Sequence, residues 1–408
     1  MDRDHAESPP DLAADLPPPR LGDRALFPAL RARAYLNHAA ISPPSERVRA
    51  VIRRCVDDYA EIGVAALFPW LERRRHLRAE LAALIGAAPD DIGLTMGTSP
   101  GITAVALGFP WRPGDRVILF TGEFPANVTP WQRAADLFGL RPVFLPLADF
   151  EASHERGLAR LEDALRAGAR LVAASTVQFQ TGLRMPIAAM AALCRRHGAA
   201  IAVDAIQACG VVPIDVAADG VDFLACGAHK WLMGVEGAGF LYVRPDRAAE
   251  LRPAVASWLS HDDPIRFLLG EPGHLRYDRP IRARADLVEG SAANVLGHAA
   301  LHAALGPLRE LGVAAIFDHV QRYLDALEGP LVERGLRSRR AADPAARSGI
   351  LSLVPPPGVD LHDLQARLAA EGVACTTPDG HLRFAPHWPS ALAEVPVVLD
   401  AVDRALAR

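Results

Sequence analysis

Short apolar runs alternate with amphipathic stretches between about residues 90 and 245. The runs have the length of buried strands: RVILF (116–120), PVFLPL (142–147), RLVAAS (170–175), AAIAVDA (199–205), DFLACG (222–227) and GFLYVR (239–244). Helical patterns such as ITAVALGF, PWQRAADLFG and IAAMAALCRRHG lie between several of them. Nearly continuous apolar strands that alternate with helices are typical of a largely parallel sheet covered on both faces. We therefore predict an α/β fold, in which functional residues collect at the carboxyl ends of the strands.

The pattern changes beyond about residue 285. A long helical stretch (294–335) is followed by short strands and turns, in GILSLVPPPGVD and GVACTTPDGHLRFAPH, and by a final helix. This pattern predicts a second, smaller α+β domain. The N-terminus is polar, acidic and rich in proline, which is typical of a disordered or extended arm. We predict an arm over residues 1–24, a large domain over 25–285 and a small domain over 286–408.

Composition narrows the class of protein. The formal net charge of −4 gives no basic field for a nucleic-acid backbone. No run reaches the roughly 18 apolar residues of a membrane span, and the N-terminus lacks the apolar region of a secretory signal. The five cysteines show no CxxC spacing, so neither a disulfide framework nor a metal site is expected. These features favour a cytoplasmic globular protein without nucleic-acid or membrane partners.

One residue stands out from the composition. Of the 44 basic residues, 43 are arginine and one, Lys230, is lysine. Arginine stays protonated, whereas a lysine amine can lose its proton and form an imine. The segment GAHKWLMGVEGAGFLYV places Lys230 in a turn just after a strand, where a bare buried cation is costly. A solvated structural lysine is the alternative, but we predict the Schiff-base lysine of a pyridoxal-phosphate enzyme.

A carboxylate and an amide precede this lysine. Asp204 closes the apolar run AAIAVDA, and a buried carboxylate there needs a cationic or hydrogen-bonding partner. The protonated pyridine nitrogen of the cofactor would be such a partner. An Asp that caps a strand–helix turn is the alternative. Gln207, one turn further on, is a candidate for the phenolic oxygen of the ring.

Other residues match the remaining demands of the cofactor and substrate. Thr98 and Ser99 begin a predicted helix, where hydroxyl and N–H groups can bind phosphate, although an ordinary helix cap explains them equally. His229 would add a charge-assisted bond to the same phosphate. Phe124 is a candidate to stack on the ring, or is a core aromatic. Arg383, one of many arginines, has the fork that binds a substrate carboxylate.

Taken together, these segments resemble the class V aminotransferase group of fold-type I pyridoxal-phosphate enzymes. The matching segments are YLNHAAISPP, DIGLTMGTSPGIT, GDRVILFTGEFPANVTPWQ, STVQFQTGLRMPI, VDAIQACG, GAHKWLMGVEGAG, VEGSAANVLG and LRFAPHWP. The resemblance implies a large domain with a mainly parallel seven-stranded sheet, a smaller C-terminal domain, and a homodimer with active sites at its interface.

The resemblance also assigns roles to individual residues. It implies that Lys230 forms the imine and transfers protons, that Asp204 binds the pyridine nitrogen, and that Gln207 binds the phenolic oxygen. It further implies that the phosphate is bound by Thr98, Ser99 and His229, together with Ser291 of the partner subunit. The contact with the ring oxygen falls to Gln178, preferred over Gln180. The substrate site contains Asn37, His38 and Arg383.

Three departures from the family pattern bear on the reaction. The mobile loop that carries the nucleophilic cysteine of desulfurases is reduced here to TTPDGH, and Cys375 before it is expected to be a core residue. Phe124 replaces the histidine that stacks on the cofactor in desulfurases, and a phenyl ring cannot transfer protons. Gly227 replaces a phosphate-binding serine. A persulfide-forming desulfurase is therefore disfavoured.

The leading hypothesis is a lyase that acts at the α-carbon of an amino acid. It would release a sulfur group from a cysteine conjugate or sulfoxide and give pyruvate and ammonia, as hercynylcysteine sulfoxide lyases do. An epimerase similar to isopenicillin N epimerase is an alternative, and would need a proton donor opposite Lys230, for which His38 is the candidate. Transamination is a third possibility. A non-catalytic cofactor-binding protein is a fourth, since fold does not fix function.

Overall fold

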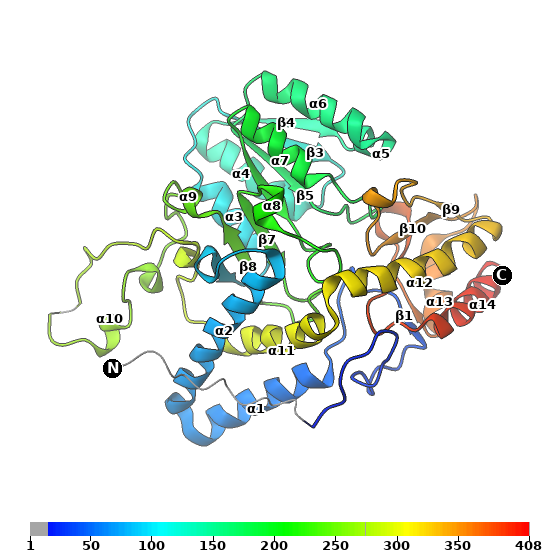
Figure 1. Ribbon diagram of the computed structural model, residues 1–408, viewed down its shortest axis with the longest axis horizontal. Coiled ribbons are helices and arrows are strands. Elements are labelled where there is room, and N and C mark those ends of the chain that lie inside the picture. The colour runs from blue at the N-terminus through cyan, green and yellow to red at the C-terminus, as the bar shows by residue number, and fades with distance from the viewer. Residues whose placement is uncertain (1–14, 274, 408) are drawn as a thin grey trace.

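Seven strands form one sheet at the centre of the molecule, in the order β2-β8-β7-β6-β5-β3-β4 (Figure 1). The structure is a computed structural model that describes residues 15–273 and 275–407. All the strands except β8 run in the same direction, so the predicted fold-type I architecture with a mainly parallel sheet is confirmed. The strands are β2 (Ile92–Thr95), β3 (Arg116–Thr121), β4 (Arg141–Pro146), β5 (Leu171–Ser175), β6 (Ala200–Asp204), β7 (Phe223–Gly227) and β8 (Gly239–Val243).

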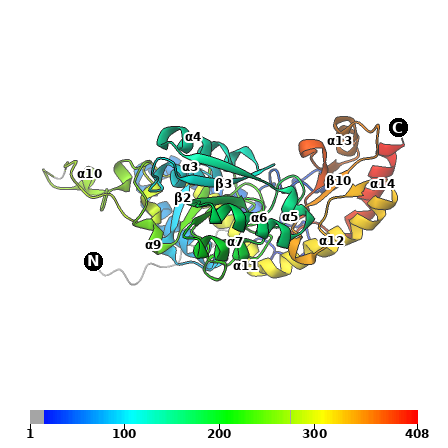
Figure 2. The ribbon, with the colours of Figure 1, turned by 90° about the horizontal axis from the view of Figure 1, so that it is seen from above.

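Helices cover both faces of this sheet. Seen from above, α3 and α4 lie on one side of the strands and α7 on the other (Figure 2). Successive residues of a strand pack into opposite layers: Ala202 belongs to the core under α3 and α4, and Val203 to the core under α6 and α7. These helices are α3 (Thr98–Gly108), α4 (Thr129–Phe138), α6 (His154–Arg166) and α7 (Ile187–Arg196). Shorter helices are α5 (Ala148–Ala152), α8 (Val216–Asp219) and α9 (Pro245–Ala248).

Local signals in the sequence set several helix ends. The hydroxyl of Ser153 accepts a hydrogen bond from the N–H of Arg156 (3.1 Å) and so caps the start of α6. Gly139 ends α4 in the left-handed conformation, at φ +68°, which favours glycine. Both features are those of ordinary helix termini.

The long helical stretch predicted over residues 294–335 is broken into two helices. Gly312, at φ +78°, separates α11 (Val295–Leu311) from α12 (Val313–Glu333), and the two axes differ by 79°. Over the described residues, no single helix has the length and apolar content to span a membrane. The two helices of this bent pair reach that length and apolar content only when they are taken together. The break lets α11 pack against the large domain while α12 packs in the small one. The partners of α11 are α1 (Glu46–Ile62) and α2 (Leu67–Ile85).

The C-terminal lobe is built on a small antiparallel sheet, in the order β12-β10-β9. A two-residue strand from near the N-terminus, β1, pairs with β11 of this lobe in parallel. The predicted boundaries at residues 24 and 285 stay a prediction; residues 1–14 of the predicted arm lie outside the described residues. The elements of the lobe are β9 (Arg337–Ser338), β10 (Leu351–Val354), α13 (Leu361–Ala370), β11 (Val373–Ala374), β12 (Leu382–Phe384) and α14 (Val395–Leu406), together with β1 (Ala34–Tyr35).

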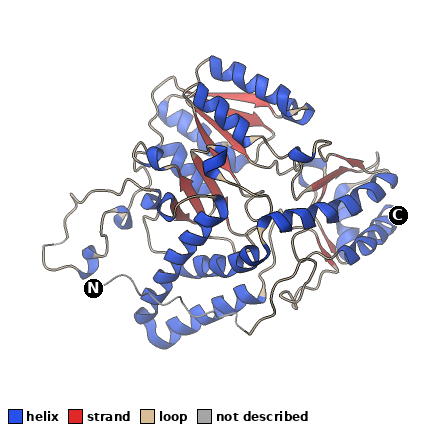
Figure 3. Ribbon diagram, in the orientation of Figure 1, coloured by secondary structure: helices blue, strands red, loops and turns tan. Residues whose placement is uncertain are grey.

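A long segment between α9 and α11 projects from the large domain and consists mostly of loop (Figure 3). It contains α10 (Arg266–Leu269) and several exposed apolar side chains, such as Leu268 and Tyr277. Several residues that the sequence singled out, among them Phe124, Asp204 and Lys230, lie at or just after the carboxyl ends of the sheet strands.

Candidate active site

Lys230 lies in the turn that follows β7. Its backbone is held in place, since its carbonyl accepts hydrogen bonds from the Ser42 hydroxyl (2.6 Å) and from the Met233 N–H (3.0 Å). Burial lowers the pKa of the Lys230 amine to about 8, and the nearby Asp204 carboxylate opposes this fall. An amine with this pKa is partly unprotonated near neutral pH, as a nucleophile or base must be.

Asp204 lies at the carboxyl end of β6, next to β7, and is buried. One oxygen accepts a hydrogen bond from the N–H of Ile206 (2.9 Å). Burial raises the pKa of Asp204 to about 7; the bond from Ile206 opposes this rise and the Glu123 carboxylate adds to it. A buried carboxylate in this state would be stabilised as an anion by a cation in contact with it, as a protonated pyridine nitrogen would be.

A small cradle lies beside them at the start of α3. A Cβ atom on Gly227 would come within 3.3 Å of the Thr98 hydroxyl oxygen and 3.4 Å of the His229 ring. The Thr98 hydroxyl is buried and has no hydrogen-bond partner among the described residues. Buried polar groups are nearly always partnered, and a helix N-terminus favours an anion. The cradle therefore fits a phosphate group. Ser99 is exposed at its rim.

Phe124 faces the lysine. The Lys230 Nζ atom lies over its phenyl ring, 5.7 Å from the centroid, and the side chain is 46% exposed. An edge-to-face contact with Phe179 (5.2 Å between centroids) holds the ring. The position between the amine and the phenyl ring is where a stacked cofactor ring would fit.

Arg383 lies in β12 and is buried. Its Nη1 donates to the Phe179 carbonyl (2.7 Å) and its Nη2 to the Thr376 hydroxyl (3.2 Å), while its buried Nε has no partner in the described part of the chain. Burial lowers the pKa of Arg383 to about 10. A buried guanidinium whose hydrogen-bond acceptors are all neutral is suited to a ligand carboxylate.

The two N-terminal candidates differ in their surroundings. The Asn37 side-chain oxygen is buried and has no partner among the residues described. The His38 Nδ1 lies 2.7 Å from the Ser42 hydroxyl, which gives its own hydrogen to the Lys230 carbonyl, so His38 must donate. Burial, and then the neighbouring His387, lower the pKa of His38 well below its usual value. His38 is therefore a neutral residue tied to the backbone of Lys230.

Gln207 is also engaged. Its amide nitrogen donates to the Ala39 carbonyl (3.0 Å), and its oxygen accepts from the Trp231 indole (2.9 Å). Its predicted contact with the phenolic oxygen of the ring stays a prediction. In this position the side chain joins the N-terminal segment to the lysine turn.

The structure adds a residue that the sequence did not single out, Glu123. Its buried carboxylate accepts hydrogen bonds from Ser175 (2.6 Å), from Asn127 (2.9 Å) and from the amide of Gln178. Burial raises its pKa. Glu123 thus fixes the side chain of Gln178, whereas Gln180 pairs at the surface with Asp379. The one feature of the sequence that could have pointed to Glu123 was its place directly before Phe124, a candidate site residue.

The sequence model of the class-V aminotransferases matches residues 70–387. The chain belongs to the class-V aminotransferase family. It is 28% identical over 387 residues to the uncharacterized aminotransferase YcbU of Bacillus subtilis, covering 93% of this chain and 96% of YcbU. It is 32% identical over 346 residues to a cysteine desulfurase of Dickeya dadantii, covering 81% and 80% of the two chains.

A solved structure gives the same result in three dimensions. The fold superposes on a lysine-to-alanine variant of the protein C-DES, which holds glycine covalently linked to pyridoxal phosphate, with a TM-score of 0.84 and 25% identity. The alignment covers 93% of this chain and 98% of C-DES. The class-V aminotransferases depend on pyridoxal 5′-phosphate, and the predicted cofactor is therefore confirmed. The orphaned Thr98 hydroxyl and the cradle at Gly227 fit its phosphate.

Within this family, the position of Cys375 is informative. It follows β11, is buried, and has its pKa raised to about 12 by burial. The connection from Cys375 to β12 is short: the next residue, Thr376, already forms an antiparallel bridge with Arg383 of β12. A thiol in this place is protonated and covered, as expected of a core residue.

Proposed function

We propose that this class-V aminotransferase family member is a carbon–sulfur lyase. It would act on a cysteine conjugate or cysteine sulfoxide and yield pyruvate, ammonia and the released sulfur group. The observation that carries this proposal is the pairing of Lys230 with Phe124. The amine supplies a base on one side of the cofactor position, and the phenyl ring opposite it cannot exchange protons.

The residues of the chain have the following parts in the proposed reaction. Pyridoxal phosphate, when bound, makes the α-hydrogen of an attached amino acid acidic. Arg383 binds the substrate carboxylate, since its guanidinium is buried beside neutral acceptors alone. Lys230 Nζ takes the α-proton, the bond from the β-carbon to sulfur breaks, and the sulfur leaves with the electron pair. Water then completes the conversion to pyruvate and ammonia. A leaving group such as a sulfenate needs little help from an acid, so one base suffices.

Two observations weigh against the alternatives within the family. Desulfurase chemistry uses an accessible thiolate, whereas Cys375 is buried with a raised pKa. Epimerisation needs a proton donor on the face opposite Lys230. The candidate His38 is neutral and donates its Nδ1 proton to Ser42, whose hydroxyl donates in turn to the Lys230 carbonyl.

A substrate panel tests the proposal. The holoenzyme is incubated with S-alkyl cysteines and their sulfoxides, with and without an α-keto acid. Pyruvate, ammonia, new amino acid and optical inversion are then measured. We expect pyruvate and ammonia in equal amounts, independent of the keto acid. Product that requires the keto acid would show transamination, and inversion without pyruvate would show epimerisation; either result, or an inert panel, would overturn the lyase assignment.

We further infer that the enzyme works as a cytoplasmic homodimer in which Ser291 of the partner subunit completes the phosphate site. Ser99 and Ser291 of one subunit are both exposed on a cavity of about 420 Å³ beside the start of α3, so this surface is open to a partner subunit. Complementation tests this: a mixture of the Lys230→Ala and Ser291→Ala proteins should be more active than either alone, because one site of the hybrid is then complete. A monomer in sedimentation analysis, with no gain on mixing, would contradict it.

A further inference from the structure

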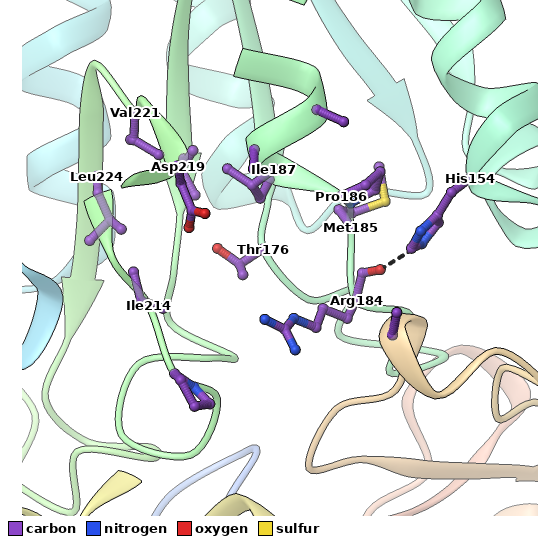
Figure 4. Close-up of a pocket in the computed structure, with 15 residues that line it drawn as sticks. His154, Thr176, Arg184, Met185, Pro186, Ile187, Ile214, Asp219, Val221 and Leu224 are labelled. Carbon is purple, nitrogen blue, oxygen red and sulfur yellow. Dashed lines mark hydrogen bonds between the residues drawn. The ribbon is translucent and has the colours of Figure 1, made fainter. Parts of the chain in front are cut away.

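A second cavity, of about 330 Å³, lies on the α6–α7 face of the sheet, away from the α3 cradle (Figure 4). Its apolar walls come from strands β6 and β7, from the start of α7 and from the segment before α8. The principal apolar residues are Ile187, Val203, Ile214 and Leu224. Ala345 of the C-terminal lobe closes one side. The volume is at the lower end of small-molecule sites, roughly 300–1,000 Å³.

Three polar side chains point into this cavity: the guanidinium of Arg184, the carboxylate of Asp219 and the hydroxyl of Thr176 (Figure 4). The backbone of Arg184 is fixed, because its N–H donates to Ala346 and its carbonyl contacts the His154 ring (3.0 Å). The guanidinium itself makes no hydrogen bond or salt bridge with any described residue. Two opposite charges therefore share one cavity without pairing with each other.

Burial disfavours the charged form of both side chains, and each charge partly offsets this for the other. Burial lowers the pKa of Arg184, and the charge of Asp219 opposes this. Burial raises the pKa of Asp219, and the carboxylate of Asp215 adds to the rise. A ligand that carries both a carboxylate and an ammonium group would stabilise both side chains at once. A ligand with only a negative charge would give Asp219 no oppositely charged partner, and a ligand with only a positive charge would give Arg184 none.

We propose that this cavity is a binding site for a free α-amino acid with an apolar side chain, separate from the catalytic site. The carboxylate of the ligand pairs with Arg184 and its ammonium group with Asp219. Its side chain lies among Ile187, Ile214 and Leu224. The cavity has the volume, the two charges and the apolar wall that this class of ligand requires.

The site is connected to the cofactor position through the segment that follows β5, which forms an isolated antiparallel bridge between Val177 and Arg184. The Thr176 N–H donates to the Asp204 carbonyl (2.9 Å), and the Met185 N–H donates to the Thr176 carbonyl (2.9 Å). Gln178, in the same segment, donates its backbone N–H to the Leu183 carbonyl (2.9 Å). An amino acid on Arg184 would therefore contact the segment that supports the cofactor-binding residues.

Calorimetry on the holoenzyme tests the assignment. The cofactor is first fixed to Lys230 by borohydride reduction, so that amino acids cannot react at the catalytic site. The probes are L-leucine, 4-methylpentanoate and 3-methylbutylamine, which share a side chain but carry both charges, the carboxylate alone and the amine alone. We expect one saturable site for L-leucine, with the other probes weaker by about tenfold or more.

Variants locate the site. Arg184→Gln and Asp219→Asn should each weaken L-leucine binding by about tenfold or more, whereas Arg166→Gln, on the exposed side of α6, should not. Cofactor absorbance and the thermal transition establish that each variant is folded. The assignment is overturned if no probe saturates, if Arg184→Gln binds L-leucine normally, or if 4-methylpentanoate binds as tightly and Asp219→Asn has no effect. None of these results depends on which reaction the enzyme catalyses.

Discussion

The residues proposed to bind the cofactor and those proposed to bind the substrate are positioned by different parts of the fold. Asp204 and Lys230 follow neighbouring strands of one buried sheet. Asn37 and Arg383 lie near opposite ends of the chain, and their segments are joined by a parallel bridge between Asn37 and Ala385. The first pair is fixed by the core of the large domain, and the second by contacts between distant segments. Substitutions in the first should therefore remove the cofactor linkage, and those in the second should weaken substrate binding alone.

The largest effect is expected for Lys230→Ala, because the one amine that can hold the cofactor and move the α-proton is then gone. Activity should fall by about 10³-fold or more. The visible absorbance of a cofactor joined to lysine should disappear, which spectroscopy measures directly. A folded variant that retains this absorbance would contradict the assignment of Lys230.

Arg383→Gln should separate the two sets of residues. The loss of a charge-assisted pair with the substrate carboxylate should lower kcat/KM by about 10- to 100-fold, mostly through KM. The cofactor spectrum should stay unchanged, since the Arg383 guanidinium donates hydrogen bonds only to Phe179 and Thr376 among the described residues. A fall in kcat with an altered spectrum would mean that Arg383 supports the cofactor, and the proposed division of the site would fail.

The same division explains how far the sequence could be interpreted. The strand that ends at Asp204 and the strand that precedes Lys230 are continuous apolar runs in the sequence, so the sheet was predictable. The roles of these two residues stay a prediction. The break at Gly312 was not predicted, because the apolar helical pattern continues on both sides of it. The role of Glu123 depends on Ser175 and Gln178, which lie more than one strand away in sequence. Such a network has no periodic signature.

The N-terminal residues illustrate the same limit. A two-residue strand such as β1 cannot be recognised from alternation, and its partner lies near the other end of the chain. The position of His38 beneath the lysine turn follows from Ser42 and from tertiary packing. The epimerase alternative depended on a free His38, so structure was needed to weigh it.

The rate at which the apoprotein binds the cofactor should depend on pH, and this effect should be smaller than those of the two substitutions above. Burial lowers the pKa of the Lys230 amine to about 8, and only the unprotonated amine reacts. The protonated amine prevails below this pH, so the rate at which the apoprotein binds pyridoxal phosphate should rise with pH and level off above about 8. The rate at pH 7 should be roughly one tenth of the plateau. Stopped-flow absorbance measures it; a rate that still rises through pH 10 would indicate an ordinary exposed lysine.

The smallest effect concerns two thiols in different regions. Cys375 lies beside the residues proposed to bind the substrate, and Cys194 lies in α7 on the far side of the sheet; burial raises the pKa of each to about 12. If both are core residues, Cys375→Ala and Cys194→Ala should each lower the free energy of unfolding by about 1 kcal/mol and change kcat by less than about twofold. Denaturant titration and steady-state assays measure the two quantities. A selective loss of activity in Cys375→Ala, with Cys194→Ala as the matched control, would restore a nucleophilic thiol to the mechanism and with it the desulfurase alternative.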